Sequence, residues 1–322
     1  MKRLITVVML VVSALWALGA SAQMYPNRPI KLIVADSAGG APDQLGRLIT
    51  ERLSNNVNQP VVVDNRPGAG GALGAELAAK SAPDGYTLLL TTTAIYAILP
   101  NLRKNLPYDP VRDFVPITRI ATASNVLVVN NELPVKDIAE LVKLAKEKPG
   151  ALNYASAGVG TPAHLAGEML NLLADIKVVH VPYKGAAPAL ADVIAGNAQY
   201  IITSPLAAGA HMNGGRVRAL ATTGTQRNPS LPDLATIAET LPGYDITQTW
   251  GIVVPTGTPP EIVNKLSAEI VKVMNQPDVR EKVLATGATP VGDSPAQFEA
   301  FMTKERQRLG DVIAKRGIVL TD

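Results

Sequence analysis

The fold is decided by the stretch Ile30-Lys-Leu-Ile-Val-Ala-Asp-Ser-Ala-Gly-Gly-Ala-Pro-Asp43. Its first six residues are nearly all apolar, as in a strand that is buried on both faces. Residues 43–53 then follow a helical period, with leucine and isoleucine on one face. The glycines and the proline between them predict a tight turn from a strand into the N-terminus of a helix. We expect this unit to belong to a sheet covered by helices, an α/β fold.

A second stretch repeats this plan more than a hundred residues later, Asn153-Tyr-Ala-Ser-Ala-Gly-Val-Gly-Thr-Pro-Ala-His164. Each stretch has Ser-Ala-Gly after a strand and a proline where a helix begins. The first turn of a helix has unpaired backbone amides and the positive end of the helix dipole, and glycines let a ligand approach the backbone. Two such helix ends facing each other would hold a carboxylate from both sides, which predicts a receptor for small organic acids.

Strand-like and helix-like segments alternate along the rest of the chain. We expect strands at 61–64, 86–93, 153–156, 178–181, 200–203 and 217–223, and helices at 43–53, 73–80, 135–147, 163–173 and 187–194. The cycle from 135 to 223 predicts a second sheet-based domain. A mature chain of about 300 residues favours two domains, and one large domain is the alternative.

Two helices with clear starts close the chain. Thr258-Pro-Pro-Glu261 and Ser294-Pro-Ala-Gln297 each fit a capping box with a proline in the first turn. The last helix carries an apolar stripe from Phe298 to Ile313 and ends near Gly317. We expect this stripe to pack against a domain surface.

The first 22 residues predict a secretory signal peptide. Lys2 and Arg3 precede an uncharged apolar run that is short for a membrane span, and Ala20-Ser-Ala22 fits a peptidase site, so we expect cleavage after Ala22. An uncleaved anchor is the alternative. The chain has no cysteine, which excludes a lipid attached through an N-terminal cysteine, and an exported domain of this size needs no disulfide. We expect the mature chain to be soluble.

The charges, the spacing of the histidines and an incomplete dinucleotide motif argue against a nucleic-acid partner, a bound metal ion and a cofactor. The chain has 30 basic and 27 acidic residues and no basic stripe interleaved with aromatic residues. Its three histidines, His164, His180 and His211, have no metal-ligand spacing. Gly158-x-Gly160-x-x-Ala163 resembles a dinucleotide fingerprint but lacks the acidic residue after the next strand. We expect His164 to donate a hydrogen bond at the helix start and His180 to be a satisfied interior histidine.

The chain also resembles the Bug-type solute-binding receptors of tripartite tricarboxylate transporters. The motifs that carry the resemblance are Tyr25-Pro-Asn-Arg-Pro-Ile-Lys31, Asp64-Asn-Arg-Pro-Gly-Ala-Gly-Gly71, Pro83-Asp-Gly-Tyr86, Leu106-Pro-Tyr-Asp-Pro-Val-Arg-Asp-Phe114, Asn153-Tyr-Ala-Ser-Ala-Gly158, His180-Val-Pro-Tyr-Lys-Gly185 and Trp250-Gly-Ile-Val-Val-Pro-Thr-Gly-Thr-Pro259. The resemblance covers essentially the whole mature chain. It implies a fold like that of type II periplasmic binding proteins, in which two α/β lobes joined by crossing strands close over a carboxylated ligand in the cleft between them.

The lobes implied by the resemblance are residues 23–125 with 224–322, and residues 126–223. We expect the hinge near 125–131 and near 222–248. The carboxylate loops of the family fall on Ser37 to Asp43 and on Ser156 to Thr161, with His164 behind. The predicted ligand-binding residues are Ser37, Ala38, Gly39, Gly40, Asp43, Arg66, Thr92, Ser156, Ala157, Gly158, Gly160, Thr161, His164, Thr203 and Ser204.

Particular contacts are expected from these residues. The hydroxyls of Ser156 and Thr161 should donate to a carboxylate, the glycine amides of the second loop should turn toward the ligand, and Arg66 should clamp a distal carboxylate. Where the family's first loop commonly has a threonine, this chain has Pro42, which removes one hydroxyl and one amide donor. Many relatives carry an acidic residue after the strand that ends at Thr203, and its absence here disfavours a ligand with an amino group.

We therefore expect a periplasmic solute-binding protein that is not an enzyme. It would capture a small organic carboxylate by hinge closure and deliver it to the membrane subunits of a transporter, as a monomer without a cofactor. The predicted ligand is a dicarboxylate, with aromatic acids such as terephthalate included. One alternative is a periplasmic hydrolase of carboxylate esters that uses Ser37 or Ser156, although Gly-x-Ser-x-Gly is absent. The other is a ligand-loaded sensor for a membrane signalling partner.

Overall fold

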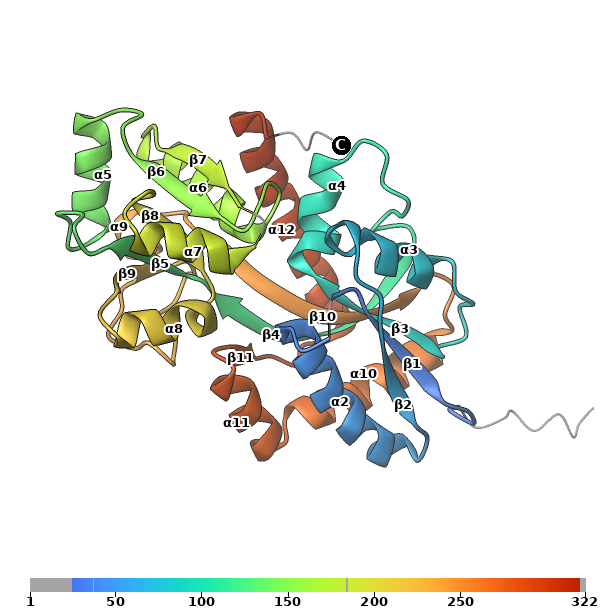
Figure 1. The fold of residues 1–322 in the computed structure, drawn as a ribbon. Helices are drawn as coiled ribbons and strands as arrows, with labels where there is room; N and C mark the ends of the chain where they lie inside the picture. The colour runs from blue at the N-terminus through green and yellow to red at the C-terminus, as the bar shows by residue number, and fades with distance from the viewer. Residues whose placement is uncertain (1–24, 37, 184, 319–322) are drawn as a thin grey trace, which may run out of the picture.

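The computed structural model describes residues 25–36, 38–183 and 185–318. The predicted signal peptide, residues 1–22, and Ser37 lie outside the described residues. Figure 1 shows two α/β lobes, each built around its own sheet, with strands that pass from one lobe to the other. In the part of the chain that the structure describes, no helix has the length and apolar character needed to cross a membrane.

The first lobe contains a six-stranded sheet in the order β11-β4-β10-β3-β1-β2, with β1, β2 and β3 mutually parallel and β10 antiparallel to β3 and β4. Its strands are β1 (Ile30–Val34), β2 (Val61–Asn65), β3 (Thr87–Thr92), β4 (Phe114–Ser124), β10 (Thr247–Pro255) and β11 (Thr289–Pro290). Side chains alternate between the two faces along each strand, so Leu32 and Leu88 belong to one apolar cluster while Ile33 and Leu89 belong to another.

Helices cover both faces of this sheet. One face packs against α2 (Ala41–Val57), α10 (Pro260–Met274) and α11 (Pro277–Ala285). The other face packs against α3 (Ala72–Ala79), the π-helical turn η2 (Ala94–Ile98), α4 (Leu99–Leu102) and α12 (Pro295–Arg316). The short η1 (Ala69–Gly71) leads into α3.

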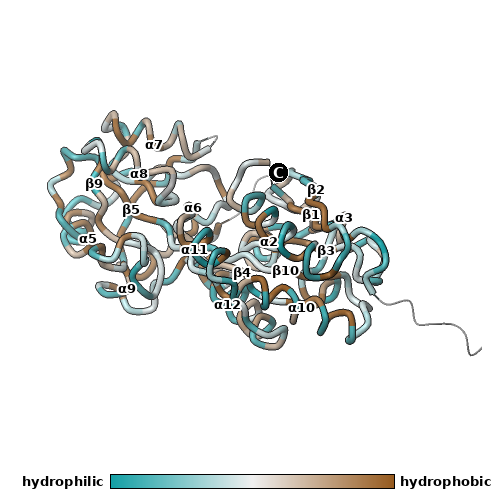
Figure 2. The backbone as a smooth tube through the Cα atoms, turned by 90° about the horizontal axis from the view of Figure 1, so that it is seen from below, coloured by the Kyte–Doolittle hydropathy of each residue, from teal (hydrophilic) through white to brown (hydrophobic). Residues whose placement is uncertain are grey.

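The second lobe contains a five-stranded sheet in the order β7-β6-β8-β5-β9. Its strands are β5 (Val126–Asn130), β6 (Asn153–Ser156), β7 (Val179–Pro182), β8 (Tyr200–Thr203) and β9 (Val217–Thr222). Helices α5 (Ile138–Glu147) and α6 (Pro162–Ala174) pack on one face of this sheet, with α9 (Ile237–Thr240) against α5, and α7 (Ala186–Ile194) and α8 (Pro205–Asn213) pack on the other. Hydrophobic stretches follow the inner strands, β5 among them (Figure 2).

The chain crosses between the lobes where β4 continues into β5 and where the segment after β9 returns to β10. The buried hydroxyl of Thr223 joins these segments, because it accepts a hydrogen bond from the amide of Asn125 (2.8 Å) and donates one to the carbonyl of Ile246 (2.7 Å). The lobe limits expected from the sequence stay a prediction. We propose that residues 231–241 move with the second lobe, because Leu231 and Leu234 pack against its apolar cluster.

The long C-terminal helix α12 packs against both lobes. It contacts η2 and α4 in the first lobe and α6 in the second. Its predicted capping box is confirmed, since the Ser294 hydroxyl accepts from the amide of Gln297 and the Gln297 side chain accepts from the amide of Ser294. The box predicted at Thr258 is wrong. That hydroxyl donates to the carbonyl of Pro255 instead, and α10 begins one residue later without a side-chain cap.

Candidate functional site

The carboxyl ends of the parallel strands in both sheets lie at the crossing between the lobes. In the first sheet, Thr92 at the end of β3 pairs with Trp250 near the start of β10, and β1 runs parallel to β3. In the second sheet, Thr203 at the end of β8 pairs with Val126 at the start of β5, and β6 runs parallel to β8. The loops after β1 and β6 therefore both lie on the sheet edge that faces the other lobe.

Both loops also lie where the order of strands reverses. β1 stands between β2 and β3, and β6 stands between β7 and β8, so the chain leaves each of these strands on one side and later returns on the other. Helices α2 and α3 consequently cover opposite faces of the first sheet. Ligands of open α/β sheets bind outside the carboxyl ends of the strands at such reversal points.

The first loop is shaped by the side chain of Asp43. One oxygen of its buried carboxylate accepts from the amide of Gly39 (2.8 Å) and from Nε of Arg47 (3.0 Å), and the other accepts from Asn65 (3.0 Å). Burial alone would raise the pKa of this carboxyl, but the hydrogen bonds from Arg47, Gly39 and Asn65 outweigh burial and lower it. Asp43, predicted to bind ligand, is thus an ionised group that holds the loop together.

The start of α2 differs from that of α6, which a threonine hydroxyl caps. Gly40 is its N-cap residue, and no side chain of the described residues caps the helix there. The proline in the first turn, Pro42, has no N–H, so the first-turn amides come from the neighbouring residues. Ala38 and Gly39 of the same loop are exposed, and Gly39 has φ +86°.

The second loop uses its hydroxyls internally. The Ser156 hydroxyl is fully buried, accepts from the amide of Gly158 (3.1 Å) and lies 2.7 Å from Nε2 of His180. The Thr161 hydroxyl donates to the carbonyl of Gly158 (2.8 Å) and caps α6 by accepting from the amide of His164 (3.3 Å). These two hydroxyls, expected to donate to a ligand, therefore have partners within the loop.

The glycine amides of this loop are engaged as well. The amide of Gly160 donates to Nδ1 of His164 (3.1 Å), and that of Gly158 is taken by Ser156. The imidazole of His164 thus accepts a hydrogen bond at the helix start, and the hydrogen bond that this residue donates there comes from its backbone amide. Because Nδ1 accepts, the neutral imidazole carries its proton on Nε2.

Two histidines form a stack behind the loop. The rings of His164 and His180 are 4.0 Å apart between centroids, and His180 also stacks on Tyr154 at 4.9 Å. Burial lowers the pKa of both imidazoles, that of His180 to about 4 with a further contribution from His164. The neighbouring carboxylate of Glu168 opposes both shifts. The sequence predicted an interior histidine with its hydrogen bonds satisfied; His180 has Ser156 as its partner, but it lies on the edge strand β7 and is only partly buried.

The remaining predicted residues lie at the ends of neighbouring strands. Arg66, after β2, pairs with Asp64 (2.9 Å) and stays half exposed, so its predicted clamping role remains a prediction. The Thr92 hydroxyl, at the end of β3, accepts from the amide of Ile95 (3.4 Å). At the end of β8, Thr203 is buried and the Ser204 hydroxyl caps α8. Ala157 lies in the second loop, partly exposed.

The structure thus gathers the predicted residues that it describes into two groups, one on each lobe. Sequence reasoning missed three residues that shape the loops: Arg47, Asn65 and Tyr154. Arg47 stands one helical turn after Asp43, a signal that the sequence contains. Asn65 contacts the loop only because β2 pairs with β1 in this register, and such pairing is not visible in a single sequence.

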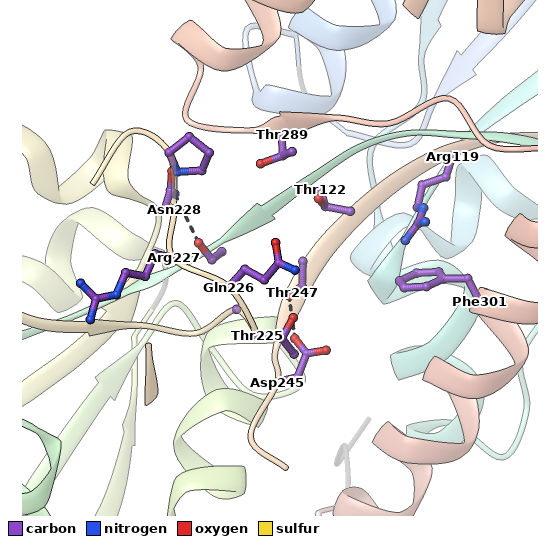
Figure 3. A pocket seen from close by; sticks show the side chains of 13 residues that line it. Arg119, Thr122, Thr225, Gln226, Arg227, Asn228, Asp245, Thr247, Thr289 and Phe301 are labelled. Carbon is purple, nitrogen blue, oxygen red and sulfur yellow. Dashed lines mark hydrogen bonds between the residues drawn. The ribbon is translucent and has the colours of Figure 1, made fainter. Parts of the chain in front are cut away.

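A separate cavity of about 260 Å³ lies beside the crossing strands. Figure 3 shows Arg119 beside Phe301 at one side of it and Gln226 near Asp245 at its centre. The cavity borders β4, β10 and β11, and β3 lies between these strands and β1. None of the predicted ligand-binding residues that the structure describes lines it.

Comparisons with known proteins identify the family. Residues 45–318 match the family model of the tripartite tricarboxylate transporter family receptor. The chain is 35% identical over 323 residues to protein BugT of Bordetella pertussis, with 99% of each chain covered.

Two solved structures share the fold. Rpa4515 of R. palustris, solved with adipate, has a TM-score of 0.79 at 35% identity, with 92% of this chain and 99% of that chain covered. MatC from Rhodopseudomonas palustris, with bound malate, has a TM-score of 0.75 at 30% identity, with 90% and 100% covered.

These matches confirm the resemblance noted in the sequence, as well as the fold expected from it. They also decide between a receptor and an enzyme, because the matched family consists of receptors. The chain belongs to the receptors of the tripartite tricarboxylate transporter family, with their two-lobe α/β fold, and is a solute receptor rather than an enzyme.

Proposed function

We propose that this receptor captures a small organic dicarboxylate between its lobes. The observation that carries the proposal is the placement of the two glycine loops, which stand at the reversal points of both sheets on the edges that face each other. Each loop leads into a helix whose dipole favours an anion. Adipate and malate, held by two similar proteins, are both dicarboxylates.

We propose further that the ligand carries no amino group. An ammonium group needs a carboxylate partner, and the segment Thr203-Ser204-Pro205 at the end of β8 provides none. In the first loop, both carboxylate oxygens of Asp43 already accept hydrogen bonds. Aliphatic acids and rigid aromatic acids such as terephthalate both fit this description.

The binding mechanism has no chemical step. A ligand docks on the loop of one lobe, and rotation about the crossing strands brings the other loop onto it. Closure is driven only by contacts that the ligand gains in the closed state. A micromolar affinity corresponds to about 8 kcal/mol, which several charge-assisted hydrogen bonds together with burial can supply.

We place this receptor in the periplasm, where the family's receptors act. The proposal includes export by the segment 1–22, cleavage after Ala22, and delivery of the loaded ligand to the membrane subunits of a tripartite transporter. Mass spectrometry of the exported protein tests the cleavage, since its mass should correspond to a chain that begins at Gln23. Uptake of the labelled acid by cells with and without the receptor tests delivery.

Isothermal titration tests the ligand class. The acids to compare are adipate, succinate, malate, citrate, terephthalate, aspartate and glutamate. At least one acid without an amino group should bind more tightly than aspartate and glutamate. Tight binding of an amino acid alone would refute the proposed preference, and mass spectrometry of any acid that co-purifies would then identify the class directly.

A further inference from the structure

The same hydrogen bond occurs in both loops. In the first, the amide of Gly39 donates to the side chain of Asp43, and in the second the amide of Gly160 donates to the side chain of His164. The acceptor is the third residue of the following helix in each case, and the donor is the residue before the N-cap. In an ordinary capping box the third residue accepts from the N-cap amide itself. Here the contact reaches one residue further back.

This bond fixes a turn that only glycine adopts readily. Gly39 has φ +86° and Gly160 has φ +78°, in the region that other residues rarely occupy. Both acceptors are buried, with Asp43 3% and His164 5% exposed. Because the side chain of Asp43 or His164 accepts a hydrogen bond from the glycine amide, this amide has its partner within the protein. The turn therefore keeps one conformation in front of the helix N-terminus.

Each acceptor is in turn held by a residue of the adjoining edge strand. Asn65, the last residue of β2, donates to Asp43. His180, in β7, stacks on His164. Strands β2 and β7 are the outer neighbours of β1 and β6, so the two lobes support their loops in the same arrangement although the acceptor is a carboxylate in one and an imidazole in the other.

We infer that Asp43 and His164 are matched positioning residues, which hold the two glycine turns in place in front of the N-termini of α2 and α6, where the ligand would bind. This inference rests on the proposed function. It gives these two side chains the role of shaping the loops, whereas the sequence predicted that both contact the ligand. An acceptor atom at the position of Nδ1 should therefore preserve the second loop, and an acceptor placed elsewhere should not.

The matched pair His164→Asn and His164→Gln tests this inference. The side-chain oxygen of asparagine can take the position of Nδ1, whereas the longer glutamine places its amide near Nε2. With ¹⁵N-glycine labelling and no ligand, the exchange protection of the Gly160 amide should persist in His164→Asn and fall at least tenfold in His164→Gln. The Gly39 amide, held by Asp43 in the other lobe, is the internal control and should keep its protection in both variants.

Titration with adipate provides the second readout. His164→Asn should bind within threefold of the wild-type affinity, and His164→Gln should bind at least tenfold more weakly, while circular dichroism shows both folded. Equal exchange of the Gly160 amide in the two variants, or equal affinities, would overturn the inference. If the wild-type protein binds none of the acids tested, the proposed function fails, and the exchange measurement alone still decides whether His164 holds the turn.

Discussion

At the scale of single residues, the two loops depend on glycines with positive φ. Gly39 has φ +86°, and a Cβ there would meet nothing within 4 Å. The cost of Gly39→Ala is therefore conformational, about 1–2 kcal/mol for an L-residue in this region. In the Gly39→Ala variant the ligand-free loop can leave this turn by giving up the hydrogen bond to Asp43, but binding of the acid requires the strained turn. We expect Gly39→Ala to bind its acid about tenfold more weakly with little change in thermal stability, and Gly39→Val to abolish binding, as titration and thermal unfolding would show.

Gly209 provides the control for this substitution. It lies inside α8, where a Cβ also meets nothing within 4 Å and no positive φ is required. Gly209→Ala should leave the affinity unchanged and should stabilise the protein by a few tenths of a kcal/mol to about 1 kcal/mol. In the second lobe, Gly158→Val should repeat the effect of Gly39→Val. Unchanged affinity in both valine variants would count heavily against the site.

The stacked histidines make stability depend on pH. Because burial lowers the pKa of His164 and His180 below the ordinary value of 6.5, the unfolded chain binds more protons than the folded chain between that value and about 4. The stability due to the neutral imidazoles is present above pH 6.5 and is lost as the pH falls toward 4. Urea unfolding should therefore give a lower free energy of unfolding at pH 5 than at pH 7.5.

A variant at His180 shows whether this residue causes the loss of stability at low pH. His180→Gln keeps a polar group near Ser156 but cannot take up a proton in this range, so its stability should change less between the two pH values than that of the wild type. Glu168, the carboxylate that faces both rings, is present in both proteins. An equal loss in both proteins would place the titrating group elsewhere.

At the scale of helices and strands, the sequence predicts best where periodicity and end signals agree. The strand at 153–156 and the end of the last helix at Gly317 match the structure. The helix expected at 135–147 begins only at Ile138, because Asp137 accepts from the amide of Glu140 and caps it. Helix α8 was missed because its small residues, among them Gly209, give it almost no amphipathic pattern. Its start is set by the Ser204 hydroxyl.

The contact between α12 and α6 includes an ion pair that links the lobes. Arg316 lies 2.7 Å from Glu168, whose carboxylate also accepts from the hydroxyl of Tyr154 and is mostly buried. We expect Arg316→Ala to lower the free energy of unfolding by about 1–2 kcal/mol, because the carboxylate loses its cation while it stays largely out of water. Chemical denaturation measures this change.

An exposed ion pair provides the matched control. Arg112 pairs with Asp109 at 2.8 Å, but its side chain is 80% exposed. Arg112→Ala should change the stability by less than about 0.5 kcal/mol. A further variant, Arg316→Ala with Glu168→Gln, should recover part of the loss, since it removes the unpaired charge. Equal effects of the two alanine variants would mean that burial of Glu168 contributes nothing.

At the scale of the whole molecule, the sequence alone could not establish that the two loops face each other. The repeated Ser-Ala-Gly plan predicts two similar loops, yet their orientation depends on which strands pair. Both loops point toward the crossing because Thr92 pairs with Trp250 in one sheet and Thr203 pairs with Val126 in the other. Thr223 then joins the crossing segments through a contact between residues nearly a hundred positions apart. Such contacts leave no local pattern.

Because the two loops lie on separate lobes, closure depends on whether one ligand can contact both of them. A ligand shifts the equilibrium between open and closed forms only by the difference in its affinity for the two forms. A dicarboxylate can contact α2 and α6 together, whereas an acid of the same length with one carboxylate can satisfy only one helix end. Saturating adipate should therefore lower the radius of gyration in small-angle X-ray scattering, and hexanoate should bind weakly and leave it unchanged. Scattering curves that stay superimposable with adipate bound, or that change equally with hexanoate, would contradict closure by contact with both lobes.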